Sequence, residues 1–171
     1  AEAAYQEALK QAKPEELSIG YRTLASFFYS RDRFEDAETT LRGGLEKAPG
    51  DLDLIYSLAR FYAARGDDAK ADSMVEEATK AKPDDVGPFL VLSAYRGRKG
   101  DLAGALQAAE DAMKAKPDSV PAKLRKAELL LDMGYREGNK EKIAEGRAIT
   151  DAVLATEAEN PEALFVRAKI D

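Results

Sequence analysis

Apolar residues in this chain recur with the spacing of amphipathic helices. Between residues 52 and 65 they fall on one side of a helix, with Leu58 three or four positions after Leu54 and Ile55, and Tyr62 four positions after Leu58. A second stretch with the same spacing follows after Gly66 and Asp67, at Ala71, Val75 and Ala78. Gly favours the left-handed end of a helix and Asp favours the start of the next one. The pattern therefore predicts two helices joined by a short turn.

The same alternation of apolar stretches and helix-breaking residues continues along the chain. Lys82-Pro83-Asp84 and Lys116-Pro117-Asp118 each end the second helix of a pair, because Pro excludes helical backbone at the residue before it. We expect helices near residues 1–12, 15–31, 34–47, 51–65, 67–81, 85–99, 101–115, 119–134, 140–159 and 162–171.

The helix pairs repeat with a period of 34 residues. A proline column falls at Pro49, Pro83 and Pro117. A column of small residues falls at Ala25, Ala59, Ser93 and Ala127, and a turn column falls at Gly66, Gly100 and Gly134. A fixed period of this length is typical of stacked helical repeats, in which each unit buries its apolar face against its neighbours. The period predicts an all-α fold, a solenoid of antiparallel helix pairs.

These columns resemble the tetratricopeptide repeat (TPR) family. One unit reads Tyr21, Leu24, Ala25, Phe28, Ala37, Leu41, Gly44 and Pro49 at the family's positions. The next reads Ile55, Leu58, Ala59, Tyr62, Ala71, Val75, Ala78 and Pro83, and the third reads Phe89, Leu92, Ser93, Arg96, Ala105, Ala109, Ala112 and Pro117. The resemblance implies a right-handed superhelix of about four repeats.

We expect residues 1–171 to form a single array. Its units are 1–14 (the second helix of a partial repeat), 18–51, 52–85, 86–119, 120–163 and 164–171 (a partial first helix). The unit 120–163 is longer than the others by about ten residues, which fall around 133–145. We expect a longer turn there and an extended second helix, whose contact position is either Ala148 or Ile149.

The C-terminal end differs from the interior of the array. Helical arrays usually finish on a polar capping helix, but here the last helix carries Leu164, Phe165, Val166 and Ile170. We therefore expect a piece excised from a longer protein. Its apolar end favours end-to-end self-association.

Charge and composition exclude several classes of function. The formal net charge is −6, whereas a nucleic-acid partner requires a basic surface. The sequence has no Cys and no His, which removes the commonest metal ligands and the commonest general base. No apolar run is long enough to insert into a membrane. We expect no enzyme activity, no metal and no cofactor, and both cytoplasm and periplasm stay open.

The family resemblance implies where a partner binds. First helices of successive repeats line a concave groove that takes an extended peptide or a helix. The groove positions best suited to partner binding are Arg22, Ser26, Tyr29, Tyr56, Arg60, Leu90, Arg98, Leu124, Glu128 and Leu131. Tyr and Arg are the residue types that most often anchor partners, and a ligand with an acidic end and an apolar end would fit.

We therefore expect a scaffold or adaptor that binds a protein or peptide partner in the concave groove. The alternatives are a substrate-positioning or regulatory arm of a larger enzyme, such as a glycosyltransferase, and a self-assembly module. The two-carboxylate clamp of chaperone-binding members is not expected. That clamp needs Asn at the ninth repeat position, which here holds Ser26, Arg60, Ala94 and Glu128.

Overall fold

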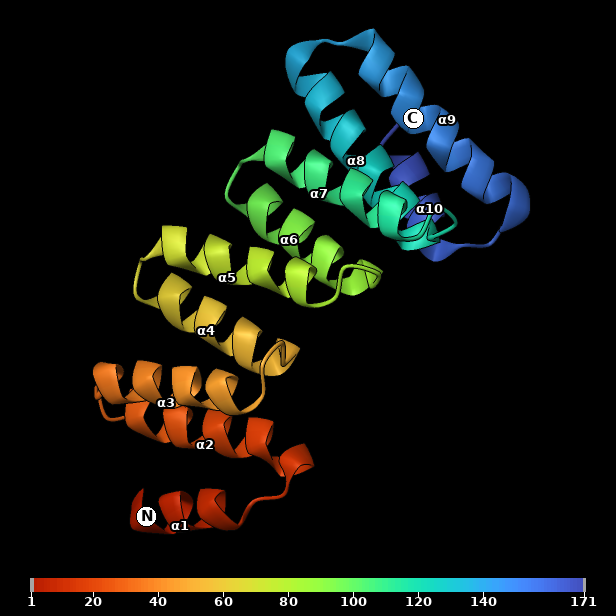
Figure 1. The fold of residues 1–171 in the computed structure, drawn as a ribbon. Coiled ribbons are helices and arrows are strands. Elements are labelled where there is room, and N and C mark those ends of the chain that lie inside the picture. Colours follow the sequence, from red (N-terminus) through yellow and green to blue (C-terminus); the bar gives the residue numbers. More distant parts are fainter. Residues whose placement is uncertain (1, 171) are drawn as a thin grey trace. The chain divides into compact units, whose positions relative to one another are not determined.

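The structure is a computed structural model that describes residues 2–170. Within these residues the chain forms ten α-helices, one short 3-10 helix and no strand (Figure 1). The prediction of an all-α solenoid built from helix pairs is confirmed. By packing, the helices fall into two compact units, one up to Lys82 and one from Pro83 onward.

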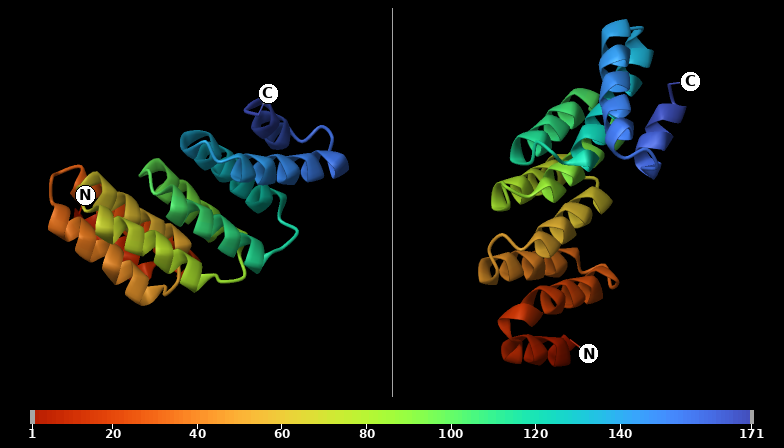
Figure 2. Two further views of the ribbon diagram at one scale, coloured as in Figure 1. Left: turned by 90° about the horizontal axis from the view of Figure 1, so that it is seen from above. Right: turned by 90° about the vertical axis from the view of Figure 1, so that its right-hand side faces the viewer.

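The first unit contains two complete helix pairs. Its elements are α1 (Glu2–Gln11), η1 (Pro14–Glu16), α2 (Leu17–Tyr29), α3 (Phe34–Lys47), α4 (Leu52–Ala64) and α5 (Asp68–Ala81). Helix α2 packs against α3 and α4 packs against α5, while α4 also contacts α3 and α2 (Figures 1 and 2). The apolar face of α4, with Leu54, Ile55 and Leu58, is completely buried.

The second unit has the same pairing and one additional helix. Its elements are α6 (Val86–Arg98), α7 (Leu102–Ala115), α8 (Val120–Glu137), α9 (Lys140–Thr156) and α10 (Pro161–Ala168). Helix α6 packs against α7 and α8 against α9, and α10 contacts both α8 and α9. Ala127, Leu131 and Val166 form one of its cores, with Ile149 packed beside them.

The small-residue columns lie where helices approach closely. Ala71 and Ala105 are fully buried in the second helix of their pairs, and Ser93 and Ala127 are fully buried in the first helix of theirs. A larger side chain at such a contact overpacks it. These columns therefore set the spacing between the helices of each pair.

Short polar side chains cap the helix starts as the sequence predicted. Asp51 accepts a hydrogen bond from Leu54 N at 2.9 Å, and Asp101 accepts one from Gly104 N at 2.8 Å. Ser119, Asn139 and Asn160 cap α8, α9 and α10 in the same way. Each cap satisfies backbone N–H groups that have no partner inside the helix.

The long repeat departs from the prediction. The expected longer turn is wrong, because α8 continues to Glu137 and α9 begins at Lys140, with only Gly138 and Asn139 between them. The extra residues lengthen both helices instead. Gly134 is therefore not a turn residue but a buried residue inside α8, where an added Cβ would lie 2.7 Å from Ile143 Cγ1.

In α9, the second helix of this repeat, the residue that packs most closely against α8 is neither Ala148 nor Ile149, the two positions expected. Gly146 is the position of closest approach, because a Cβ there would lie 2.9 Å from Leu131 Cγ. Ala148 is exposed and Ile149 packs at the edge of the core. None of the described helices is both long enough and apolar enough to span a membrane.

Candidate functional site: a hollow between α2 and α4

One face of α2 carries most of the groove residues predicted for the first unit. Ile19, Arg22, Ser26 and Tyr29 are spaced three or four residues apart, so they lie along one side of the helix. The apolar residues Leu24, Ala25 and Phe28 face the core instead and are buried. The helix therefore presents a mixed polar and aromatic stripe beside its packed face.

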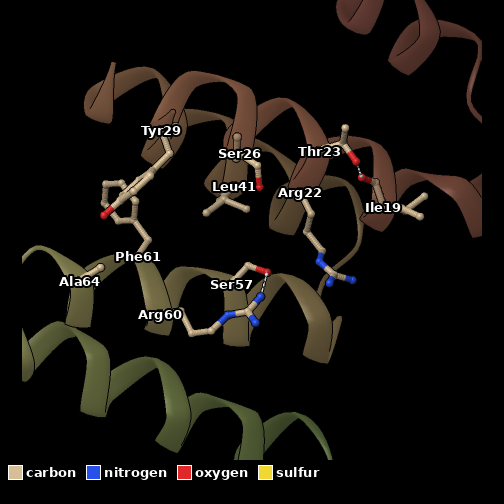
Figure 3. Close-up of a pocket in the computed structure, with 12 residues that line it drawn as sticks. Ile19, Arg22, Thr23, Ser26, Tyr29, Leu41, Ser57, Arg60, Phe61 and Ala64 are labelled. Atoms are coloured by element: carbon tan, nitrogen blue, oxygen red, sulfur yellow. Dashed lines mark hydrogen bonds between the residues drawn. The ribbon is translucent and has the colours of Figure 1, made fainter. Parts of the chain in front are cut away.

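The facing side of α4 completes a hollow of about 500 Å³. Helix α4 contributes Ser57, Arg60, Phe61 and Ala64, whose spacing again places them on one side of the helix. Buried apolar residues line the deeper part: Ala25, Ala37 and Leu41. Figure 3 shows Tyr29 and Phe61 at one end of the hollow and Arg22 and Ile19 at the other. The structure thus brings together Arg22, Ser26, Tyr29 and Arg60.

The aromatic end of the hollow is held in place by ring contacts. The Tyr29 ring meets Phe34 edge-on at a centroid distance of 5.2 Å and meets Phe61 at 6.0 Å. Edge-to-face contacts at these distances are favourable for aromatic rings. Tyr29 nevertheless stays 38% exposed, so a fixed aromatic surface faces the hollow.

The two arginines of the hollow differ in their partners. Arg22 Nη1 lies 2.6 Å from Asp53 Oδ2, an ion pair that joins α2 to α4. Arg60 donates to the Ser57 hydroxyl through Nη2 at the long distance of 3.4 Å. Within the described residues, Arg60 forms no ion pair. The hollow therefore contains one neutralised and one available positive charge.

The remaining predicted residue of the first unit lies outside this hollow. Tyr56 is half-buried and is not among the residues that line it. Four residues separate Tyr56 from Arg60, so Tyr56 lies beside Arg60 on α4, on the side away from Ser57 and Phe61. Spacing alone did not show that the hollow ends before Tyr56.

In the second unit, a separate hollow of about 470 Å³ gathers three predicted residues, Leu90, Leu124 and Glu128. Its walls come from α6, α8 and α10, including the exposed ring of Phe165. Leu124 is only 3% exposed, so it forms the floor and not the rim.

The carboxylate of Glu128 is already occupied. It accepts from Lys169 Nζ at 2.6 Å and from Arg125 Nη1 at 2.8 Å. Burial alone would raise the pKa of Glu128, but the hydrogen bonds and charges of Lys169 and Arg125 outweigh it and lower that pKa. The carboxylate thus joins α8 to Lys169, which directly follows α10.

The last two predicted residues are separated from both hollows. Arg98 lies exposed at the end of α6, beside a smaller hollow of about 330 Å³ that Asp132 also lines. Leu131 is fully buried in the core of α8, α9 and α10, which corrects its assignment to a partner-binding surface. The elongated α8 and α9 pack closely at this level, and the sequence did not reveal that contact.

Arg125 is an important side chain that the sequence analysis overlooked. Its guanidinium donates to Ser93 Oγ at 3.0 Å, to the Ser93 carbonyl oxygen at 3.1 Å and to Glu128 at 2.8 Å. The spacing of Arg125 and Glu128, three residues apart on a helix, was the available signal. The contact with Ser93 on α6 was not predictable from spacing. In the part of the chain that the structure describes, no group of three or more Asp or Glu residues is arranged to hold a metal ion.

Comparison with known proteins agrees with the architecture. Residues 28–88 match the family model of the tetratricopeptide repeat. None of the curated proteins compared with the chain matches it.

Several solved structures share the fold. One is the crystal structure of YrrB, described as a TPR protein with an unusual peptide-binding site. Its sequence is 18% identical to this chain and its TM-score is 0.52, and the match covers 99% of this chain and 92% of YrrB. A TPR protein from Parabacteroides merdae ATCC 43184 is 16% identical, with a TM-score of 0.64, over 99% of this chain and 64% of that one. The MamA protein is 15% identical, with a TM-score of 0.55, over 91% of this chain and 84% of that one.

Proposed function

We propose that the chain, whose residues 28–88 match the family model of the tetratricopeptide repeat, binds a peptide segment or helix of a partner protein in the hollow between α2 and α4. It acts as a scaffold or adaptor, and the chemistry of any process it serves belongs to its partners. YrrB, whose fold the chain shares, is described as having a peptide-binding site. The proposal for this chain rests on its own hollow.

The observation that carries the proposal is the convergence of Arg22, Ser26, Tyr29 and Arg60 around a hollow with an apolar floor. Ligand sites combine apolar walls with a few oriented polar groups, and Tyr and Arg are the commonest anchors of protein interfaces. Ring contacts and an ion pair hold two of these residues in place without a ligand. A preorganised surface loses less free energy to ordering when it binds.

A size-matched pair of substitutions tests the proposal. Peptides are selected from a phage-displayed random dodecapeptide library on the immobilised chain and are then synthesised with a fluorescent label. Their affinities are measured for the wild type, for Ser26→Trp and for Ser73→Trp. Ser26 lies exposed at the hollow, whereas Ser73 is exposed on α5 and does not line it.

The indole ring at position 26 fills the hollow, so we expect Ser26→Trp to abolish binding and Ser73→Trp to retain it. Circular dichroism confirms that both variants keep the helical fold. Equal binding of the selected peptides to both variants places the binding surface elsewhere and overturns the proposal.

A second candidate function, self-association, is favoured by two exposed apolar side chains on α10. Leu164 is 48% exposed and Phe165 is 63% exposed, and adjacent exposed apolar groups favour association. Light scattering at two protein concentrations tests it. A mass that rises with concentration in the wild type and stays monomeric in Phe165→Ser supports self-association, and a constant monomer mass in both refutes it.

A further inference from the structure

We infer that the hollow between α2 and α4 selects a peptide with one carboxylate next to an apolar side chain. Arg60 receives the carboxylate, and Asp53 disfavours a second one. The inference rests on the proposed function, because it names the ligand chemistry of the same hollow.

Arg60 supplies the charge that a ligand can use. A guanidinium presents five N–H donors in a fork that matches a carboxylate. Among the described residues, only the long contact from Nη2 to Ser57 Oγ engages this fork, and the Ser57 hydroxyl itself donates to the Asp53 carbonyl oxygen at 2.7 Å. The Arg60 side chain is exposed and lines the hollow. A carboxylate that enters the hollow therefore meets a guanidinium without a competing ion-pair partner among the described residues.

Arg22 is not available in the same way. Asp53 lies 2.6 Å from it and neutralises its charge. Asp53 and Arg60 are seven residues apart on α4, which is two helical turns and about 10 Å along one side of the helix. The Asp53 side chain is 66% exposed. A second carboxylate near Arg22 would have to displace Asp53 or lie beside a like charge, and both cost free energy.

The space between the two charged positions suits an apolar side chain. Ala25 and Leu41 are 4% and 3% exposed and form an apolar floor. The rings of Tyr29 and Phe61, fixed edge-to-face at 6.0 Å, form the wall at one end. Figure 3 shows Arg60 on the α4 side of this hollow, across from Ser26. When an aliphatic or aromatic side chain of the peptide occupies this space, the acidic residue next to it in the peptide lies beside Arg60.

The test uses the labelled peptides selected on the wild-type chain. Each acidic residue of a peptide is changed to Gln and to Lys. Affinities are measured by fluorescence anisotropy for the wild type, Arg60→Gln and Arg60→Glu. Arg31→Glu is the matched control, because Arg31 is exposed in the same unit and does not line the hollow.

We expect the selected peptides to be enriched in Asp or Glu next to an apolar residue. Changing that acidic residue of the peptide to Gln weakens its binding to the wild-type chain by about tenfold. Arg60→Gln weakens binding of the unchanged peptide by about as much, and the two changes together weaken binding no further. Arg60→Glu binds the Lys peptide better than the acidic one, while Arg31→Glu behaves as the wild type. Asp53→Asn improves binding of peptides with two carboxylates by about fivefold, because it frees Arg22.

The outcomes separate this inference from the proposed function. In one outcome, the selected peptides no longer bind Ser26→Trp, but they lack an acidic residue or bind the Arg60 variants as tightly as the wild type. The hollow is then still the binding surface, and its selectivity for a carboxylate is overturned. An unchanged preference in Asp53→Asn overturns the role of Asp53. Peptides that Ser26→Trp still binds, or a library that yields no binder, overturn both.

Discussion

Arg125 Nε donates a hydrogen bond to Oγ of Ser93 at 3.0 Å, and this contact joins α8 to α6 within the second unit. Ser93 is fully buried. Gly97 lies one turn further along α6, where an added Cβ would come within 2.7 Å of Arg125 Nη2. The missing side chain at position 97 therefore gives the guanidinium access to Ser93.

Replacing Arg125 by Met is expected to destabilise the second unit by about 2–3 kcal/mol. The Met side chain retains much of the apolar contact but leaves the Ser93 hydroxyl without its charged partner and removes one of the two cations beside Glu128. The free energy of unfolding is measured by urea titration. Arg147→Met, an exposed position on α9, is the control, and an equal effect of the two changes would refute a structural role for the Arg125 contact.

Two adjacent glycines in α3 are expected to respond oppositely to alanine. A Cβ at Gly44 would lie 2.9 Å from Tyr21 Cγ and 3.0 Å from Leu54 Cδ2, whereas at Gly43 the nearest atom is 3.9 Å away. Gly44→Ala should therefore cost about 1–3 kcal/mol through overpacking. Gly43→Ala should gain about 0.5–1 kcal/mol, because Gly is unfavourable inside a helix. Urea titration of both variants measures the difference, and two changes of the same sign would contradict this account.

Gly44 also illustrates what the sequence was able to predict. Local periodicity and helix-breaking residues located every described α-helix, though not the short 3-10 helix at Pro14–Glu16, because these patterns depend on the backbone and on one apolar face. Gly44 stands in the column that holds Ala78 and Ala112 in the next two repeats, and only its contacts with Tyr21 and Leu54 explain the change. For the groove residues too, the sequence predicted positions along a helix but not contacts between helices. Spacing placed Arg60 on the side of α4 that lines the hollow. It did not reveal that Asp53 neutralises Arg22, because that ion pair depends on how α2 and α4 pack.

The turn before α3 contains Asp32 in a left-handed conformation, with φ of 58°. One and two repeat periods later, Gly66 and Gly100 take the same turn position with φ of 78° and 84°. A side chain in this backbone region is strained, although Asp tolerates it better than most residues. We expect Asp32→Gly to stabilise the first unit by about 0.5–1 kcal/mol and Asp32→Ala to destabilise it. Thermal and urea unfolding of the two variants test this, and a loss of stability in Asp32→Gly would show that the Asp32 side chain stabilises the turn.

Tyr62 links α4 to α3 through a network of short hydrogen bonds. Its hydroxyl donates to Glu38 Oε1 at 2.6 Å and accepts from Arg42 Nη2 at 2.6 Å. Burial, followed by the hydrogen bond to Glu38, raises the pKa of Tyr62 to about 12. The hydrogen bond from Tyr62 also lowers the pKa of Glu38, against the opposing effect of its burial.

This raised pKa predicts a loss of stability at high pH. An unfolded tyrosine loses its proton near pH 10, so between about pH 10 and 12 the unfolded chain binds fewer protons than the folded one. The contribution of Tyr62 is therefore complete below pH 10 and decreases by about 1.4 kcal/mol per pH unit above it. Urea titrations from pH 8 to 12 should show the stability of the wild type falling toward that of Tyr62→Phe over this range. Tyr135→Phe, at an exposed position, removes a hydroxyl outside this network and controls for the titration of other groups. A difference between the wild type and Tyr62→Phe that stays constant with pH would mean that the Tyr62 hydroxyl is not held by Glu38.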